Sequence, residues 1–248
     1  AVTHRCLSRT GRDAPFAHLA DQTWDQLEVR FPGWETVGKL QRPNGTSPNG
    51  RRVYSRVRQR DYDAAILHDA ARHPNIRFVA QDIIGFRDDH TGGVVELPEG
   101  ELRAPLVLQS TRLSPSNDAV PARHPLRQHF GGWEVRTQHP IFDPQVATLM
   151  DFDTDQFDAT AFFYVLPEAR DRALVEFTMF SPQPRDPAFY DIQLRDYLER
   201  RGAGAVSIER TEYGVIPMDD RRRDQQWGEH VWNLGTVGGM TKPTSGYT

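Results

Sequence analysis

The chain has 248 residues, 38% of them hydrophobic and 26% charged, and its 34 acidic and 30 basic residues give a net charge of −4. This apolar fraction supports a folded core, and the acidic balance argues against a general nucleic-acid binder because no strong positive field is available to hold phosphates. The single cysteine, Cys6, excludes an internal disulfide and a multi-cysteine zinc site. The longest apolar run, 161–166, is far shorter than the roughly 20 residues that span a bilayer.

The N-terminal half carries scattered signals. Residues 1–50 hold several Pro-Gly and Asn-Gly turn dipeptides, and we expect them to be irregular. A helix is predicted over 61–72, where apolar side chains recur at helical spacing before Pro74. Three short strands are predicted next, at 76–80, 94–97 and 106–108. Residues 112–123, which contain two prolines, are interpreted as a crossover between two parts of the fold.

The C-terminal half is richer in strands. Runs of four to eight apolar and β-branched residues predict five strands, at 133–137, 147–152, 161–166, 173–180 and 205–212. Short polar turns between them favour antiparallel pairing. One helix interrupts them: Asp186 is its predicted cap, Pro187 fits its first turn and Gly202 ends it. Its predicted apolar side consists of Phe189, Ile192, Tyr197 and Leu198. These elements predict a mixed α/β (α+β) fold with a substantial antiparallel sheet.

Aromatic residues gather on the predicted strands: Phe152, Phe162, Phe163, Tyr164, Phe177 and Phe180. They could form an ordinary sheet core, which is the commoner use of such residues, or an apolar wall for a hydrocarbon ligand. Composition alone leaves both interpretations open.

Glu176 stands in the middle of an apolar strand, 174–180. Burial of this carboxylate would be costly and would raise its pKa, which favours the neutral acid, a proton donor suited to an alkene. The alternative is a side chain on the solvated face, which the run alone favours.

Two charged runs and one glycine-rich stretch complete the candidates. Asp151, Asp153 and Asp155 alternate along an extended segment and could hold a cation, although a solvated strand end is the preferred interpretation. The basic run 221–223 is interpreted as a solvated loop. Residues 234–248 hold four glycines and many hydroxyl side chains, and such a segment can bring its backbone close to a phosphate.

Several motifs, in the same order, resemble those of the bacterial flavin-dependent lycopene cyclases. They are Gln128-His129-Phe130-Gly131-Gly132-Trp133, Leu149-Met150-Asp151-Phe152, Leu174-Val175-Glu176-Phe177-Thr178, Gly214-Val215-Ile216-Pro217-Met218 and the run from Gly235 to Thr248. They cover residues 124–248 densely, and the similarity over 20–110 is looser.

The resemblance implies an enzyme that closes β-ionone rings on lycopene without net redox change. An acid protonates the terminal double bond, and reduced FAD stabilises the cation, with NAD(P)H as the reductant of the flavin. By resemblance, Glu176 is the catalytic acid–base. The implied flavin-contacting residues are Gly235, Thr236, Gly238, Gly239, Met240, Lys242, Pro243 and Gly246. The expected substrate-binding residues are Phe152, Phe163, Tyr164, Phe180, Pro217 and Met218.

The resemblance also implies a division of the chain. Residues 1–112 are expected to be part of an FAD-binding, Rossmann-like domain, 113–213 an antiparallel-sheet substrate domain, and 214–248 a return to the FAD domain. The family's Gly-x-Gly-x-x-Gly turn is absent, and Gln109 stands in a segment where the family has a flavin motif. The sequence is therefore expected to be an internal fragment of such an enzyme, cytoplasmic and docked at the membrane surface where lycopene dissolves. A related FAD-dependent monooxygenase or isoprenoid reductase, and a non-catalytic isoprenoid-binding remnant, are the alternatives.

Overall fold

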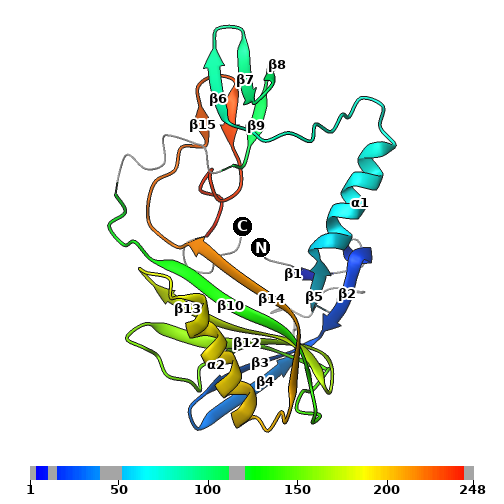
Figure 1. Cartoon of the computed structure of the whole chain (residues 1–248), viewed down its shortest axis with the longest axis vertical. Coiled ribbons are helices and arrows are strands. Elements are labelled where there is room, and N and C mark those ends of the chain that lie inside the picture. Colours follow the sequence, from blue (N-terminus) through cyan, green and yellow to red (C-terminus); the bar gives the residue numbers. More distant parts are fainter. Residues whose placement is uncertain (1–3, 11–15, 40–51, 112–120, 243–248) are drawn as a thin grey trace. The chain divides into compact units, whose positions relative to one another are not determined.

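The computed structural model describes residues 4–10, 16–39, 52–111 and 121–242. The chain forms two compact units, which are described separately below (Figure 1). Unit 1 comprises residues 1–74 and 129–215, and unit 2 comprises 75–128 and 216–248. The described residues form mostly strands, with two α-helices, so the mixed α/β class predicted from the sequence is confirmed.

A seven-stranded sheet forms the body of unit 1, with strand order β14-β10-β13-β12-β11-β3-β4. Its five C-terminal strands are β10 (Arg127–Thr137), β11 (Val146–Asp151), β12 (Thr160–Ala169), β13 (Arg172–Ser181) and β14 (Val206–Pro217). All five were predicted, and β12 pairs antiparallel with both β11 and β13 as expected. The apolar runs locate these strands well because each is long and flanked by polar turns.

The expectation that residues 1–50 are irregular was wrong for most of the described part. The N-terminal strands are β1 (His4–Thr10), β2 (Ala20–Trp24), β3 (Gln26–Phe31) and β4 (Trp34–Lys39). The turn dipeptide Pro32-Gly33 does form a turn, with Gly33 at φ +72°, but it joins two strands of one hairpin. β3 then pairs in parallel with β11, more than a hundred residues away, and such a partner leaves no local signal. The other predicted turns, at 43–45 and 48–50, lie outside the described residues.

Helix α2 (Pro187–Arg200) covers one face of the sheet (Figure 1). The carboxylate of Asp186 accepts a hydrogen bond from the amide of Ala188, which confirms the predicted cap. The buried side of the helix carries Tyr190, Leu194, Tyr197 and Leu198. These residues pack with Val175, Phe177 and Met179 of β13 in the larger core cluster. Ile192 was predicted on this side but is 55% exposed, because the buried stripe runs through Tyr190 and Leu194.

The opposite face of the sheet has its own apolar cluster. Trp24 of β2 and Tyr54 of β5 (Arg52–Arg58) pack there with Leu166 and Leu174. The indole N–H of Trp24 donates to the carbonyl of Pro167 at 3.2 Å. The small sheet β1-β5-β2 therefore supplies the residues that cover part of this second face.

Helix α1 (Gln59–Ala71) confirms the helix predicted at 61–72, although none of its residues is buried. The strand predicted at 76–80 is absent, and Ile76, Phe78 and Val79 are exposed in an extended segment with no strand assignment. Its apolar composition is that of a strand, but no neighbouring strand pairs with it among the described residues. No helix in the described residues is long and apolar enough to cross a membrane.

Unit 2 contains two small three-stranded sheets. One is the meander β6 (Gly85–Asp89), β7 (Gly92–Leu97) and β8 (Gly100–Ala104); the other has the order β15-β16-β9, from Gln226–Trp227, Val231–Asn233 and Val107–Gln109. The predicted strands at 94–97 and 106–108 correspond to β7 and β9. β6 and β7 pair antiparallel and are joined by a tight turn at His90 and Thr91. Most of the predicted crossover, residues 112–120, lies outside the described residues.

The predicted division into 1–112, 113–213 and 214–248 follows function, whereas the compact units follow contacts. Residues 1–74 belong to the same unit as the antiparallel sheet, because β3 and β4 extend that sheet and β2 packs on it. The assignment of flavin binding to residues 1–112 and 214–248 stays a prediction.

Candidate functional site

Glu176 lies at the centre of β13, on the sheet face opposite α2. Alternation along the strand places Val175 and Phe177 under the helix, while Leu174 and Glu176 face the Trp24–Tyr54 side. The Glu176 side chain is only 7% exposed, so the solvated-face alternative does not hold. Across the strand pair Glu176 stands opposite Tyr164 of β12, whose hydroxyl lies 2.7 Å from the hydroxyl of Tyr54. A buried carboxyl thus stands beside a tyrosine pair and an apolar cluster.

An aromatic row continues along the same face, toward the ends of β11 and β13. The Phe162 ring lies 5.5 Å from that of Phe152 and 5.7 Å from that of Phe180, and Phe152 stacks on Phe31 at 4.9 Å. Three of the predicted substrate-binding residues, Phe152, Tyr164 and Phe180, therefore share the Glu176 side of the sheet. This part of the face offers apolar and aromatic surface close to the Glu176 carboxyl.

Phe163 does not belong to that row. Its ring stacks on Tyr197 of α2 at 3.9 Å and is fully buried in the core under the helix. Consecutive strand residues point to opposite faces, so the neighbouring Phe162 lies on the Glu176 side instead. We therefore remove Phe163 from the candidate substrate surface and add Phe162.

A second buried carboxyl, Glu212 of β14, was missed from the sequence. It is 2% exposed and lies on the Glu176 face, where both side chains approach Gly132 of β10. Its own segment, Arg210-Thr211-Glu212-Tyr213, is polar and resembles a solvated strand end. β14 is an edge strand of the sheet, and the burial of Glu212 becomes visible only in the folded chain, where its side chain packs over Gly132 of β10.

His129, from the resemblance motif 128–133, is fully buried but faces α2. Its Nδ1 lies 2.8 Å from the Tyr190 hydroxyl and its Nε2 lies 2.7 Å from the Ser181 hydroxyl. The Ser181 hydroxyl donates to the carbonyl of Gln183, and the Tyr190 hydroxyl accepts from the amide of Arg185. One neutral tautomer satisfies these two contacts: Nε2–H donates to the Ser181 hydroxyl and Nδ1 accepts from the Tyr190 hydroxyl. The histidine therefore joins strand to helix in a hydrogen-bond chain.

The three aspartates at 151–155 do not converge. Asp151 is buried and accepts hydrogen bonds from the Tyr197 hydroxyl at 3.1 Å and from the Arg201 guanidinium at 2.9 Å. Burial raises the pKa of Tyr197 despite the opposing charge of Arg201. Asp153 and Asp155 instead line a surface cavity with Gln193 and Arg200. Within the described residues, no group of three or more His, Cys, Asp or Glu side chains could hold a metal ion.

The glycine-rich loop in unit 2 is a closed turn as far as Lys242. Gly235 and Gly239 adopt left-handed φ values of +61° and +72°. The amide of Met240 donates to the carbonyl of Gly235 at 2.9 Å, and the amide of Gly239 donates to Thr236 at 3.2 Å. Because these amides bond within the loop, the expected phosphate cradle cannot use them. Side chains of residues 236–242 could still contact such a ligand, and the Thr236 hydroxyl there lies 3.0 Å from that of Thr241.

The base of this loop is fixed by polar side chains. Gln109, whose segment departs from the family's flavin motif, is buried and donates from its side-chain amide to Asn233. Its side-chain carbonyl oxygen accepts from the amide of Thr111 at 2.8 Å. The amide of Leu234 donates to the backbone carbonyl of Gln109 at 2.7 Å. Gln109 therefore has a structural function in joining β9 to the start of the loop.

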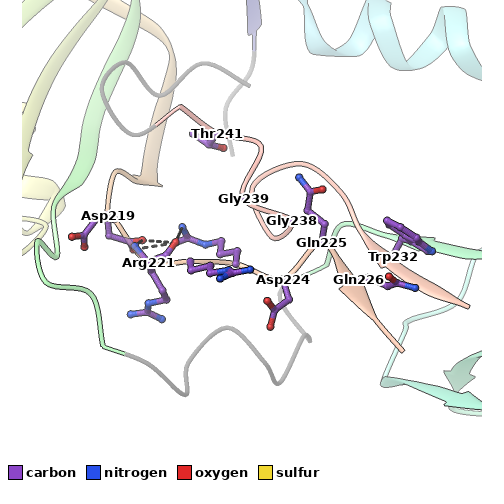
Figure 2. A pocket seen from close by; sticks show the side chains of 12 residues that line it. Asp219, Arg221, Asp224, Gln225, Gln226, Trp232, Gly238, Gly239 and Thr241 are labelled. Atoms are coloured by element: carbon purple, nitrogen blue, oxygen red, sulfur yellow. Dashed lines mark hydrogen bonds and ion pairs between the residues drawn. The ribbon is translucent and has the colours of Figure 1, made fainter. Parts of the chain in front are cut away.

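A cavity of about 610 Å³ lies beside the loop and is lined by Gly238, Gly239, Thr241, Trp232 and the segment 219–226. Figure 2 shows the glycines on a loop facing the segment that carries Asp219, Arg221 and Asp224. Arg223 forms an ion pair with Asp219 at 2.9 Å, so the basic run is not simply a solvated loop. Guanidinium and hydroxyl groups are the donors that a phosphate-bearing ligand requires.

The remaining predicted residues are placed as follows. Met218, just after β14, is buried, and its amide donates to the carbonyl of Leu126 at 2.9 Å. Pro217 ends β14, and both residues belong to unit 2, whereas Glu176 belongs to unit 1. Lys242 is exposed. Pro243 and Gly246 lie outside the described residues.

Solved structures show the same fold at low sequence identity. A geranylgeranyl bacteriochlorophyll reductase-like protein from Thermoplasma acidophilum aligns with a TM-score of 0.69 and 13% identity, over 97% of this chain and 62% of its own. A flavin-dependent halogenase from Xanthomonas campestris gives a TM-score of 0.63 and 12% identity, over 97% and 59%. Halogenase PltM in complex with phloroglucinol and FAD gives a TM-score of 0.57 and 12% identity, over 92% of this chain and 50% of its own. The chain thus spans between half and two thirds of the length of these proteins.

No curated protein matches the chain significantly. The sequence model of the family described as lycopene cyclase protein, however, matches residues 4–248, which is nearly the whole chain. This match agrees with the order of the sequence motifs. The chain belongs to the lycopene cyclase protein family.

Proposed function

We propose that the protein forms β-ionone rings on the ends of lycopene by acid-catalysed cyclisation, with Glu176 as the proton donor. The buried carboxyl of Glu176 beside the apolar and aromatic cluster of its sheet face is the observation that carries this proposal. A hydrocarbon offers no hydrogen bonds, so its site needs apolar walls and one acid. Family membership supports a carotenoid substrate of this kind.

The proposed step conserves atoms and charge. The Glu176 carboxyl transfers its proton to the terminal double bond, and the carbocation is attacked by a second double bond, which closes the ring. A ring carbon then loses a proton to the Glu176 carboxylate, so that the acid is restored. The apolar row of Phe152, Phe162 and Phe180 would exclude water, which could otherwise trap the cation as an alcohol.

We further propose that unit 2 binds FAD through the loop 235–246 and the adjoining cavity. The described part of this site offers donors to a phosphate-bearing group through the side chains of Arg221, Arg222 and Thr241, and the same cavity is also lined by Asp219, Asp220 and Asp224. The amides of residues 238–240 are not available for this purpose. In its reduced form the flavin would supply negative charge that stabilises a cation, and NAD(P)H would serve as its reductant.

The proposal also places the protein at a membrane surface, from which it would take lycopene as a peripheral protein of the cytoplasm. The solubility of the substrate is the reason, since a C40 hydrocarbon partitions into the bilayer.

The test is cyclisation by the Glu176→Gln variant. The chain, expressed with the sequence that flanks it in its gene, is supplied with lycopene in lipid vesicles, FAD and a reductant, and ring products are separated by chromatography. We expect loss of ring formation by about 10²–10⁴-fold, the usual contribution of a general acid, with bound flavin unchanged. Glu209→Gln, which changes an exposed glutamate on β14, is the matched control and should retain activity. Normal cyclisation by Glu176→Gln would rule out the proposed proton donor.

The similarity to a reductase-like protein favours one competing function, reduction of an isoprenoid by the flavin. The two reactions differ in the mass of the product: cyclisation yields an isomer of lycopene, whereas reduction adds two hydrogens per double bond. Mass spectrometry of the same incubation therefore separates them. A product heavier by two hydrogens, formed equally well by Glu176→Gln, would establish the reductase.

A further inference from the structure

The hairpin of β3 and β4 ends in two exposed aromatic side chains. β4 is an edge strand of the seven-stranded sheet, and Pro32-Gly33 forms the turn that joins it to β3 (Figure 1). On either side of this turn, Phe31 is 45% and Trp34 55% exposed, and their ring centroids lie 5.6 Å apart. The two residues are cross-strand partners, so both side chains extend from the same face of the sheet. Residues 31–34 are called the aromatic turn below.

The face that carries the aromatic turn is the Glu176 side of the sheet. Alternation along β3 puts Leu27 on the same side as Phe31, and Leu27 packs against the apolar cluster of Trp24 and Tyr54. The exposed rings therefore share one sheet face with the proposed proton donor.

A row of aromatic rings leads from the aromatic turn into the sheet. Phe31 stacks on Phe152 at 4.9 Å, and the Phe152 ring lies 5.5 Å from that of Phe162. Phe162 is buried, and the next residue on the same face of β12 is Tyr164, the cross-strand partner of Glu176. The row thus begins at the surface and ends beside the buried carboxyl, so that apolar side chains line the whole distance.

The charged groups around the aromatic turn are mostly acidic. Two surface cavities adjoin the turn, and the carboxylates that line them are Glu35, Asp153, Asp155, Asp196 and Glu199. The cations that line them are Arg30, which already forms an ion pair with Glu28 at 2.8 Å, and Arg200. An anionic surface would be repelled here, whereas the ammonium group of a zwitterionic phospholipid would meet charges of opposite sign.

We propose that the aromatic turn docks on a bilayer of zwitterionic phospholipid, with Trp34 at the level of the headgroups. The choice of partner rests on the proposed cyclisation, because its hydrocarbon substrate dissolves in a bilayer. The indole ring combines apolar surface with an N–H donor and therefore favours this level of the membrane. A protein that covered the turn would close the outer end of the aromatic row, whereas a lipid surface leaves that end open to a hydrocarbon chain.

Vesicle binding tests the docking without any reaction. The full chain is sedimented with sucrose-loaded phosphatidylcholine vesicles, and the bound fraction is followed against lipid concentration. Trp34→Ala should weaken binding about 10-fold, because the variant lacks a large apolar side chain that the lipid would bury. Phe78→Ala changes an aromatic side chain of unit 2 that is 58% exposed, and this matched control should bind like the unaltered chain. Absence of binding by the unaltered chain, or equal affinities of the unaltered chain and Trp34→Ala, would overturn the proposal.

The lipid composition tests the charge argument. Partial replacement of phosphatidylcholine by phosphatidylglycerol should leave binding equal or weaker, because the carboxylates around the turn repel an anionic surface. Binding that strengthens with phosphatidylglycerol would contradict a zwitterionic partner. Loss of binding in Phe78→Ala instead of Trp34→Ala would assign the lipid contact to unit 2 and overturn the proposal.

Fluorescence reports the position of Trp34 itself. Brominated acyl chains should quench the unaltered chain more than Trp34→Phe, which keeps an aromatic ring at the turn; equal quenching would count against docking by this residue. Dimers that form without lipid and dissociate in Trp34→Ala, seen by analytical ultracentrifugation, would identify a second copy as the partner and refute the bilayer.

The docking surface and the cyclisation can fail separately. The expected vesicle binding by a protein that forms no ring product would reject the cyclisation and retain the docking surface. Cyclisation of vesicle-borne lycopene by Trp34→Ala with the KM of the unaltered protein would reject the docking surface and retain the cyclisation.

Discussion

The chain of hydrogen bonds through His129 makes a quantitative prediction for stability. His129 and Tyr190 are both buried, and each satisfies the other: the tyrosine hydroxyl donates to Nδ1 at 2.8 Å. His129→Ala leaves the hydroxyl of Tyr190 without its acceptor, which costs about 1–3 kcal/mol. The lost ring packing adds about 2 kcal/mol, as for other buried large-to-small changes. We therefore expect His129→Ala to lower the free energy of unfolding by about 3–5 kcal/mol.

Tyr190→Phe should cost less, about 1–2 kcal/mol, because it removes only the hydroxyl group. The amide of Arg185, which loses the same hydroxyl, belongs to an exposed residue and can bond to water. In the double variant both partners of this hydrogen bond are absent, so its loss leaves neither side chain with a missing partner. The free-energy costs of the two single substitutions should therefore not add. A coupling free energy of about 1–2 kcal/mol is expected for such a contact pair.

Urea denaturation of the four proteins measures this coupling from the midpoints and slopes. Ser181→Ala serves as a control at the other side of the His129 ring, where the half-buried hydroxyl of Ser181 accepts a hydrogen bond from Nε2. Its cost should be about 1 kcal/mol. Additive costs for His129→Ala and Tyr190→Phe, within about 0.5 kcal/mol, would refute a stabilising hydrogen bond between these two side chains.

Two further predictions concern the ion network of unit 1 and the loop of unit 2. Burial by itself raises the pKa of Asp21, but hydrogen bonds and attraction from Arg56 and Arg58 outweigh it and hold the pKa below its ordinary 3.8. The stability that this carboxylate contributes is therefore complete above about pH 4 and is lost as the pH falls through the lowered pKa. In Asp21→Asn, the urea concentration at the unfolding midpoint should fall less steeply as the pH is lowered below about 4. An equally steep fall in this variant and in the unaltered protein would contradict the prediction. In unit 2, a Cβ on Gly238 would collide with the backbone of Asn233, so Gly238→Ala should abolish hydrogen-exchange protection of the Met240 amide. Gly235→Ala, which has open space but a left-handed φ, should cost only about 1–2 kcal/mol and keep that protection, and equal exchange in both variants would count against the closed turn.

Strands β10 to β14 and helix α2 could be predicted because their signals are local. β11, β12 and β13 each contain an apolar run between polar turns, and Asp186 and Pro187 mark the helix start through the backbone chemistry of a first turn. Ile192 was misplaced because the spacing of apolar residues does not say which of two adjacent stripes meets the sheet. Tertiary packing on β13 selects the stripe of Tyr190 and Leu194.

The N-terminal strands could not be predicted in the same way. β3 alternates weakly, and much of its stabilisation comes from parallel pairing with β11, a partner more than a hundred residues distant. The segment 76–80 shows the reverse case, in which strand-forming residues stay exposed because no neighbouring strand is available among the described residues. Local propensity is thus neither sufficient nor necessary where the hydrogen-bond partner is remote.

The candidate site illustrates the same distinction at the level of chemistry. Glu176 could be identified from its motif, and alternation along β13 then fixed which neighbours share its face. Glu212 carried no such signal, since its segment is polar and its side chain is buried by packing over Gly132 of the neighbouring strand β10. Gly132 connects the two observations: a glycine inside a strand weakens the sheet, so its presence between two strands calls for a close approach by something else. Here the approaching groups are the side chains of Glu176 and Glu212, and Glu212 lies in a segment that the motif of Glu176 does not contain.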